Sequence, residues 1–171
     1  KEVLIEIATL ITDSELNVLE EGPCIAIHQR DEILDKMDEW NTKHHNASGL
    51  VKRVQQSLID EVEAEKRTLD FIKKYCPKGV APLCGNSIHQ DRKFLHKYMR
   101  GMHEYFHYRS IDVTSIKELV TRWYPTGPNF PKKSQEHVAM IDIRESLQEL
   151  IFYRENYFIG KEVIVPESTA I

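Results

Sequence analysis

Two apolar segments near the start of the chain constrain the fold most strongly. Residues 3–12 and 23–28 are rich in Ile, Val, Leu and Ala, and "TDSEL" and "EEGP" separate the segments. This pattern predicts three strands in an antiparallel meander, at residues 3–12, 16–21 and 23–29. Two further short strands are expected in "VAPLCGNS" and "RSIDV". Strands first in a meander and then alternating with helices predict an α/β fold, in which helices cover a mixed sheet.

Helical periodicity accounts for most of the remaining chain. A helix is expected at residues 31–43, and a long one opened by Ser57 and stopped by Pro77. "SIHQ" predicts a capping box, in which Ser87 and Gln90 satisfy the first amides of the next helix. Helices should also cover residues 114–123 and about 137–157. In the last of these, apolar residues recur three or four positions apart and should face the core, namely Ala139, Ile143, Leu147, Leu150 and Ile151.

Composition limits the class of protein. A chain of 171 residues, 41% of them hydrophobic, fits one compact domain over residues 1–171, with a peripheral tail from about residue 159. Three cysteines without metal-ligand spacing predict reduced, buried thiols in a reducing compartment. No apolar run is long enough for a membrane span, so no membrane partner is expected. A net charge of −4 argues against a surface that grips long duplexes.

Two aspartates and a histidine are the candidates for chemistry. Asp91 follows the Ser87 cap by four residues, just beyond the carboxyl end of a strand, where open α/β sheets place ligands. Asp142 lies in the first turn of the last helix. Each aspartate could instead only complement a helix dipole. His137 could be an ordinary surface residue, and it can share a site with Asp142 only if it precedes the regular helix, because five helical residues would place it about 140° away.

Three ordered motifs show a family resemblance. The segments "LCGNSIHQDRKFL", "HYRSIDVTSIKEL" and "HVAMIDIRESLQEL", in this order and at these separations, resemble the oligoribonucleases of the DEDDh exonuclease family. "IEIATLITDSELNVLEEGP", "MDEWN", "ASGLV" and "KYM" extend the resemblance over about residues 3–158. The resemblance implies a ribonuclease H-like fold, in which four carboxylates hold two divalent metals and a histidine is the general base.

The resemblance also implies roles for the three candidates. Asp91 matches the third carboxylate, Asp142 the fourth and His137 the base. Oxygen ligands suit Mg²⁺ or Mn²⁺, and a neutral histidine can take a proton from the attacking water at cellular pH. The family's histidine lies on mobile chain before its helix, which removes the angular difficulty.

One departure concerns the first two carboxylates. The family carries them in a DxE motif, on a strand upstream of the segment that aligns with Lys1, and this chain has no such motif. Glu2 and Glu6 do not replace them easily, because "IEIATLITD" already matches the next strand. We therefore expect that the first strand of the fold is missing from this sequence. Ile141 also stands where relatives often carry an additional aspartate.

Further positions match the family's contacts with substrate and partner. Ser87, Arg109 and Thr114 match groups that bind a 5′ phosphate, while His107 and Tyr108 match residues that reach across a homodimer.

Two more matches lie earlier in the chain. Trp40 matches a wedge against the bases, and His45 a position near the scissile bond. Simpler interpretations stay open for several of these residues: Trp40 as core, Tyr108 packed on the sheet, Arg109 paired with a surface acid and His45 capping a loop.

The sequence thus predicts a metal-dependent 3′-to-5′ exoribonuclease. It would hydrolyse very short single-stranded RNA to nucleoside 5′-monophosphates, as a homodimer in the cytoplasm or in a mitochondrion. One alternative is an inactive relative that binds short RNA without the DxE carboxylates. Another is a DNA-directed proofreading domain, which the acidic composition and the branch-specific "HYRSIDV" and "MDEWN" make the weaker choice.

Overall fold

The fold begins with an antiparallel hairpin. The computed structural model describes residues 2–134 and 138–158. Strands β1 (Glu6–Thr12) and β2 (Val18–Ala26) pair over most of their length. Asp13 ends β1, because its carboxylate accepts hydrogen bonds from the backbone N–H groups of Glu15 and Asn17, each at 2.9 Å. An aspartate that binds its own backbone in this way favours a turn over a continued strand.

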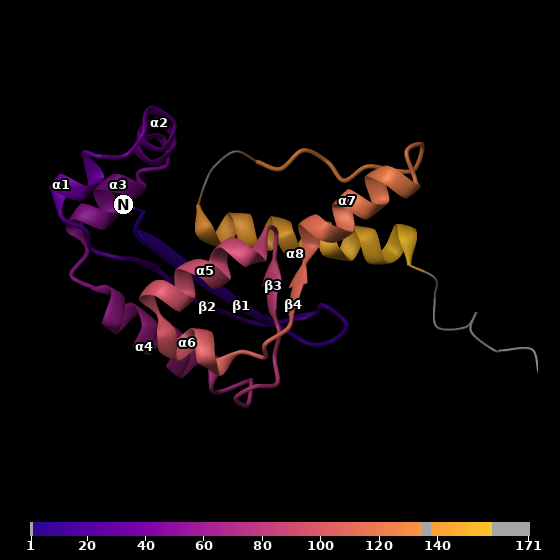
Figure 1. Cartoon of the computed structure of the whole chain (residues 1–171), viewed down its shortest axis with the longest axis horizontal. Coiled ribbons are helices and arrows are strands. Elements are labelled where there is room, and N and C mark those ends of the chain that lie inside the picture. The colour runs from indigo at the N-terminus through magenta and orange to yellow at the C-terminus, as the bar shows by residue number, and fades with distance from the viewer. Residues whose placement is uncertain (1, 135–137, 159–171) are drawn as a thin grey trace, which may run out of the picture.

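Helices and two short strands follow the hairpin (Figure 1). The next helices are α1 (Asp31–Leu34), α2 (Glu39–Ala47), α3 (Leu50–Gln56) and α4 (Glu61–Ile72). Strand β3 (Leu83–Gly85) leads into α5 (Ile88–Tyr98) and α6 (Arg100–Tyr105). Strand β4 (Ser110–Asp112) pairs parallel to β3, and α7 (Val113–Trp123) and α8 (Ala139–Tyr157) complete the described fold.

Three apolar clusters connect these elements. The largest joins the hairpin to α4, α5 and α6, and contains Ile11, Ile25, Ile27, Ala64, Phe71, Ile72, Leu95, Met99 and Met102. A second joins α7 to α8 through Val113, Val120, Leu150 and Tyr153. A third, Leu34, Leu50 and Val54, packs α1 and α3 together. Each fully buried aliphatic side chain contributes roughly 1.5 to 3 kcal/mol. The hairpin and α8 therefore have firm support on the side away from the solvent.

The predicted α/β class is confirmed. One antiparallel and one parallel sheet are flanked by helices. Within the described residues the strands form two separate two-stranded sheets rather than one mixed sheet. The helices expected near residues 114–123 and 137–157 correspond to α7 and α8, and the short strands correspond to β3 and β4.

The predicted three-stranded meander is wrong. Residues 16–21 and 23–29 do not form separate strands, because β2 runs through Gly22 and Pro23. Ala8 lies opposite Cys24 and Leu10 lies opposite Glu21, so the pairing register shifts between these two pairs. Gly22 and Pro23 therefore lie at a bulge. A bulge bends a strand without ending it, and it accommodates a proline that cannot donate to the ladder.

Two predicted helices have other boundaries. The helix expected at residues 31–43 is divided into α1 and α2, and Asp38 caps α2 by accepting from the Asn41 N–H at 2.8 Å. Ser57 does not open the long helix. Its hydroxyl donates to the Ala26 carbonyl at 2.6 Å, and Asp60 caps α4 instead.

The predicted burial of cysteine is also wrong, because Cys24 and Cys84 are exposed and Cys76 is half-buried.

Within the part of the chain that the structure describes, none of the helices combines the length and apolar character needed to cross a bilayer.

Candidate active site

The turn between β3 and α5 brings two predicted phosphate-binding residues together. The hydroxyls of Ser87 and Thr114 lie 3.3 Å apart, and the Ser87 N–H donates to Thr114 Oγ1 at 2.9 Å. The same N–H donates to Asp112 Oδ1 at 3.0 Å, and this carboxylate also caps α7 through the Thr114 N–H. Two parallel strands thus end side by side and place their following residues at one edge.

The predicted capping box at this turn is wrong. Ser87 precedes α5 with a left-handed φ of 51° and makes no side-chain cap. Gln90 Nε2 lies 3.2 Å from His89 Nε2 rather than at the helix start. The Ser87 hydroxyl faces Thr114 because two hydrogen bonds hold the Ser87 backbone against Asp112 and Thr114. A ligand oxygen that bound here could take the place of the contact between the Ser87 and Thr114 hydroxyls.

Asp91 lies in the first turn of α5 and is exposed. The protein around its carboxylate raises the pKa of Asp91 by desolvation, and the negative charge of Asp112 adds to this effect. A cation at this position would relieve both effects, because it favours the ionised carboxylate. A bound cation would therefore favour the ionised form of Asp91.

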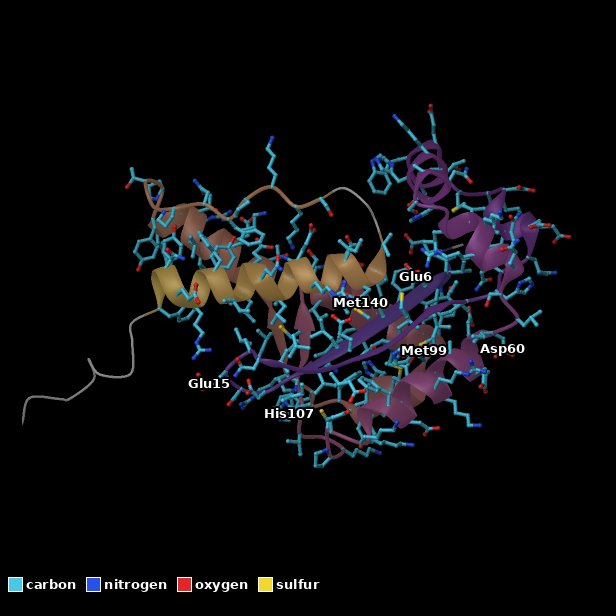
Figure 2. All side chains as sticks on the ribbon, turned by 180° about the vertical axis from the view of Figure 1, so that it is seen from behind. Glu6, Glu15, Asp60, Met99, His107 and Met140 are labelled. Atoms are coloured by element: carbon cyan, nitrogen blue, oxygen red, sulfur yellow. The ribbon has the colours of Figure 1, made fainter. Side chains whose placement is uncertain are left out.

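Asp142 lies in the first turn of α8 and is half-buried. Glu6 of β1 positions the beginning of this helix, since its Oε2 accepts from the Ala139 N–H at 3.0 Å (Figure 2). Arg53 holds the other oxygen of Glu6 at 2.5 Å. His137 lies outside the described residues.

His107, Tyr108 and Arg109 form a stacked group ahead of β4. The rings of His107 and Tyr108 stack with centroids 4.5 Å apart, and the Arg109 guanidinium lies 5.2 Å from the Tyr108 ring centroid. Tyr108 is 75% exposed, so it does not pack on the sheet. Arg92 of α5 holds this segment by donating to the Arg109 carbonyl at 2.9 Å, to Ser110 Oγ at 2.8 Å and to the His107 carbonyl. Arg92 was not predicted as a functional residue from the sequence.

Trp40 and His45 both lie on α2, at the end of the molecule away from α7 (Figure 1). The Trp40 side chain is 55% exposed and stacks on His44 with centroids 4.1 Å apart, so it is not a core residue. His45 is half-buried. Helix α2 lies away from the turn between β3 and α5 that carries Ser87 (Figure 1).

The described residues do not by themselves complete a metal site. Within residues 2–134 and 138–158, no group of three or more His, Cys, Asp or Glu side chains is arranged to hold a metal ion. Asp91 and Asp142 supply the oxygen donors that hard divalent cations prefer, but two carboxylates are fewer than such a site needs.

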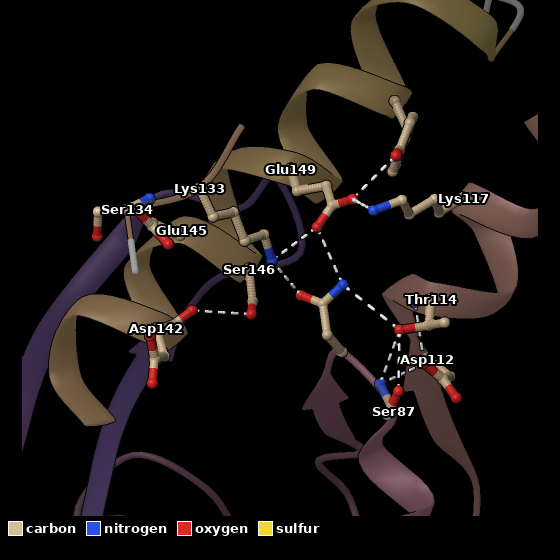
Figure 3. Close-up of polar contacts among 12 residues, drawn as sticks. Ser87, Asp112, Thr114, Lys117, Lys133, Ser134, Asp142, Glu145, Ser146 and Glu149 are labelled. Atoms are coloured by element: carbon tan, nitrogen blue, oxygen red, sulfur yellow. Dashed lines mark hydrogen bonds and ion pairs between the residues drawn. The ribbon is translucent and has the colours of Figure 1, made fainter. Parts of the chain in front are cut away.

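Sequence reasoning also missed a buried polar group behind the turn. Glu149 of α8 is 1% exposed and contacts Lys133, Asn86, Tyr153 and Lys117 (Figure 3). The helical pattern offered a weak signal, since Glu149 directly precedes Leu150, which lies on the apolar stripe. A glutamate at such a position is ordinarily exposed, so only the structure shows that it is buried.

Comparison with known proteins gives the class of this protein, which is an exonuclease. Residues 1–150 match the sequence model of the exonuclease family. The chain is 55% identical to the oligoribonuclease of Shewanella amazonensis over 155 residues, which are 91% of this chain and 86% of that protein. The identity to the Pseudomonas putida F1 oligoribonuclease is 54% over 156 residues, covering 91% of this chain and 87% of that protein. The Legionella pneumophila Corby oligoribonuclease is 53% identical over 160 residues, covering 94% and 86%.

The chain therefore belongs to the oligoribonucleases of the DEDDh exonuclease family. Membership assigns it to the 3′-to-5′ exoribonucleases.

Proposed function

We propose that this protein hydrolyses very short single-stranded RNA from the 3′ end and releases nucleoside 5′-monophosphates. The observation that carries the proposal is the hydroxyl pair of Ser87 and Thr114, in which Ser87 precedes Asp91 by four residues. Four residues of helix span about 6 Å along the axis, so a phosphate held at the pair leaves room for few nucleotides before Asp91. The relatives are named oligoribonucleases, which supports an RNA oligonucleotide as the substrate.

The protein's own side chains would hold the two ends of this substrate. Arg109 would pair with the 5′ phosphate beside Ser87 and Thr114, because guanidinium and hydroxyl groups donate to phosphate oxygens. Tyr108 and Trp40 expose aromatic faces that can stack on bases, and such stacking contributes roughly 1 to 3 kcal/mol per base. His45 would lie near the scissile bond.

Asp91 and Asp142 would supply two of the carboxylates that hold Mg²⁺ or Mn²⁺. Bound ions of this kind activate water and stabilise the leaving oxygen. His137 would accept the proton of the attacking water.

We also propose a homodimer, in which His107 and Tyr108 contact substrate bound to the partner subunit. Large apolar side chains are exposed along β4, α7 and their flanks, namely Tyr108, Ile111, Leu119, Trp123 and Tyr124. Exposed apolar groups on neighbouring elements mark an interaction surface. The bacterial relatives and the class of reaction support a place in the cytoplasm.

A direct test uses a 5′-labelled diribonucleotide with the purified protein, once with Mn²⁺ and once with EDTA. The proposal expects labelled monophosphate only with the metal, and a loss of about a hundred- to a thousandfold in rate for Asp91→Asn or Asp142→Asn. Full activity of either variant would contradict it. Binding of the dinucleotide without cleavage in Mn²⁺ would favour the inactive RNA-binding relative.

A further inference from the structure

Glu149 is a buried carboxylate that the proposed chemistry does not use. Its Oε2 accepts from Lys133 Nζ at 2.7 Å and from Asn86 Nδ2 at 3.0 Å (Figure 3). Its Oε1 accepts from the Tyr153 hydroxyl at 2.9 Å, and Lys117 Nζ lies 3.8 Å away. A buried carboxylate is tolerated in its ionised form only when it is paired and hydrogen-bonded in this manner.

The partners of Glu149 come from different parts of the fold. Lys133 belongs to the loop between α7 and α8, and Asn86 belongs to the turn between β3 and α5. Lys133 Nζ also donates to Asn86 Oδ1 at 2.7 Å, so Glu149, Lys133 and Asn86 close a triangle. Both ends of the Asn86 amide are therefore occupied by charged groups. Hydrogen bonds to charged groups are stronger than neutral ones, and this amide cannot rotate without losing both.

The held residue directly precedes the proposed phosphate-binding residue. Ser87 has a left-handed φ of 51°, which is disfavoured for a residue with a Cβ. Such a conformation persists only where the surroundings hold it, and it is common at ligand sites. Asp112 and Thr114 hold Ser87 on one side. On the other side, Asn86 is held by Glu149 and Lys133.

We propose that Glu149 is a positioning residue for substrate binding: with Lys133 it fixes Asn86, and through Asn86 it fixes the direction of the Ser87 hydroxyl toward the 5′ phosphate. This inference rests on the phosphate-binding role proposed for Ser87. A carboxylate kept for stability alone would gain little here, since apolar residues of similar volume usually serve a core as well as a buried ion pair does. The contacts among Glu149, Lys133 and Asn86 hold the turn in one conformation. Without them, the backbone at Ser87 could move to a more favourable conformation.

The test compares two diribonucleotides that differ only in whether they carry a 5′ phosphate. Glu149→Gln preserves the shape of the side chain but removes its charge and one acceptor. We expect KM for the 5′-phosphorylated substrate to rise about tenfold, as for the loss of one hydrogen bond to a charged group. The KM for the 5′-hydroxyl substrate and both kcat values should stay within about twofold of the original values.

Matched variants separate positioning from stability. Tyr153→Phe removes a hydrogen bond to the other oxygen of Glu149, so it should lower Tm without changing the preference for a 5′ phosphate. Lys133→Met changes a side chain that is 29% exposed. It should reproduce the KM effect, and it carries the test if Glu149→Gln does not fold.

Ser87→Ala identifies which proposal fails. If Ser87→Ala reduces the preference for a 5′ phosphate and Glu149→Gln and Lys133→Met do not, the positioning role is wrong while the phosphate site stands. Equal KM changes for both substrates, or a change in Tm alone, would also overturn the positioning role. If Ser87→Ala leaves the preference unchanged, the proposed phosphate site is wrong and the positioning role falls with it.

Discussion

At the scale of single residues, the functional candidates are held by neighbours that contribute no chemistry themselves. Arg92 holds the carbonyl groups of the segment that carries Tyr108. Glu6 holds the first amide of α8, one turn from Asp142. Residue types that can bind phosphate or metal are visible in a sequence, but the groups that orient them become visible only once the chain is folded.

Asp91 gives a prediction with a pH dependence. Desolvation, and to a lesser extent the charge of Asp112, raise the pKa of Asp91 in the folded protein. The ionised Asp91 carboxylate therefore lowers the stability of the fold. This loss begins as the pH rises past the ordinary pKa of aspartate and is complete above the raised pKa. Asp91→Asn should therefore raise Tm at pH 7 in EDTA and abolish cleavage. Activity of the unchanged protein should fall at acidic pH, because protons compete with the metal for the carboxylate.

Thermal melts in EDTA and pH profiles of kcat/KM check both statements. Asp70→Asn is a matched control, because Asp70 is an exposed aspartate on α4, paired with Lys73 at 3.7 Å. It should change neither Tm at pH 7 nor activity appreciably. A lower Tm for Asp91→Asn in EDTA, together with retained cleavage, would show that Asp91 is an ordinary first-turn acid.

At the scale of elements, local sequence signals located the helices and strands whose ends depend on local residues. Helix α7 begins where Asp112 accepts from the Thr114 N–H, and α8 follows its apolar spacing. The failures involve distant partners. Ser57 resembles a helix cap, yet its hydroxyl donates to Ala26 in β2, 31 positions earlier in the chain. Ser87 likewise binds Thr114 rather than its own helix.

The candidate site divides in the same way. The family resemblance of the sequence predicted Ser87 and Thr114 as phosphate-binding residues. The structure places their hydroxyls 3.3 Å apart. Glu149 and Lys133 were not predicted, because they lie 16 positions apart and meet only through packing of the loop on α8. The roles of Asp91, Asp142 and His137 stay predictions.

Gly22 gives the prediction that belongs to this scale. A Cβ at Gly22 would lie 2.4 Å from Phe71 Cε1, so β2 can approach α4 only because residue 22 has no side chain. Gly22→Ala should lower the free energy of unfolding by about 1 to 3 kcal/mol, as for other overpacked cores. Urea unfolding measures the change.

The double variant Gly22→Ala with Phe71→Leu gives the control, since the smaller side chain removes the atoms that clash. Two losses in the free energy of unfolding are compared: that caused by Gly22→Ala in the Phe71→Leu protein, and that caused by Gly22→Ala in the unchanged protein. The first loss should be smaller. Equal losses in the two backgrounds would mean that backbone effects at the bulge, and not the contact with Phe71, require the glycine.

At the scale of the whole molecule, the arrangement separates two parts of the proposed site. Trp40 and His45 lie on α2 at one end, while Tyr108 and Arg109 precede β4 at a distance from α2 (Figure 1). In the proposed homodimer, a second subunit would bring its own Tyr108 to the substrate that Trp40 contacts. The exposed Trp123, at 66%, lies at the end of α7 where such a subunit could pack.

A mixing experiment tests this arrangement in solution. Asp91→Asn and Tyr108→Ala should each be nearly inactive alone. If Tyr108 acts on the partner's substrate, exchange of subunits at equal amounts should restore about a quarter of the sites, because half of the dimers are mixed and each has one intact site. Trp123→Asp should shift the sedimenting species from dimer to monomer and prevent the recovery. Additive, unrecovered activity in the mixture would mean that Tyr108 acts within its own subunit, and the proposed partner contact would then be wrong.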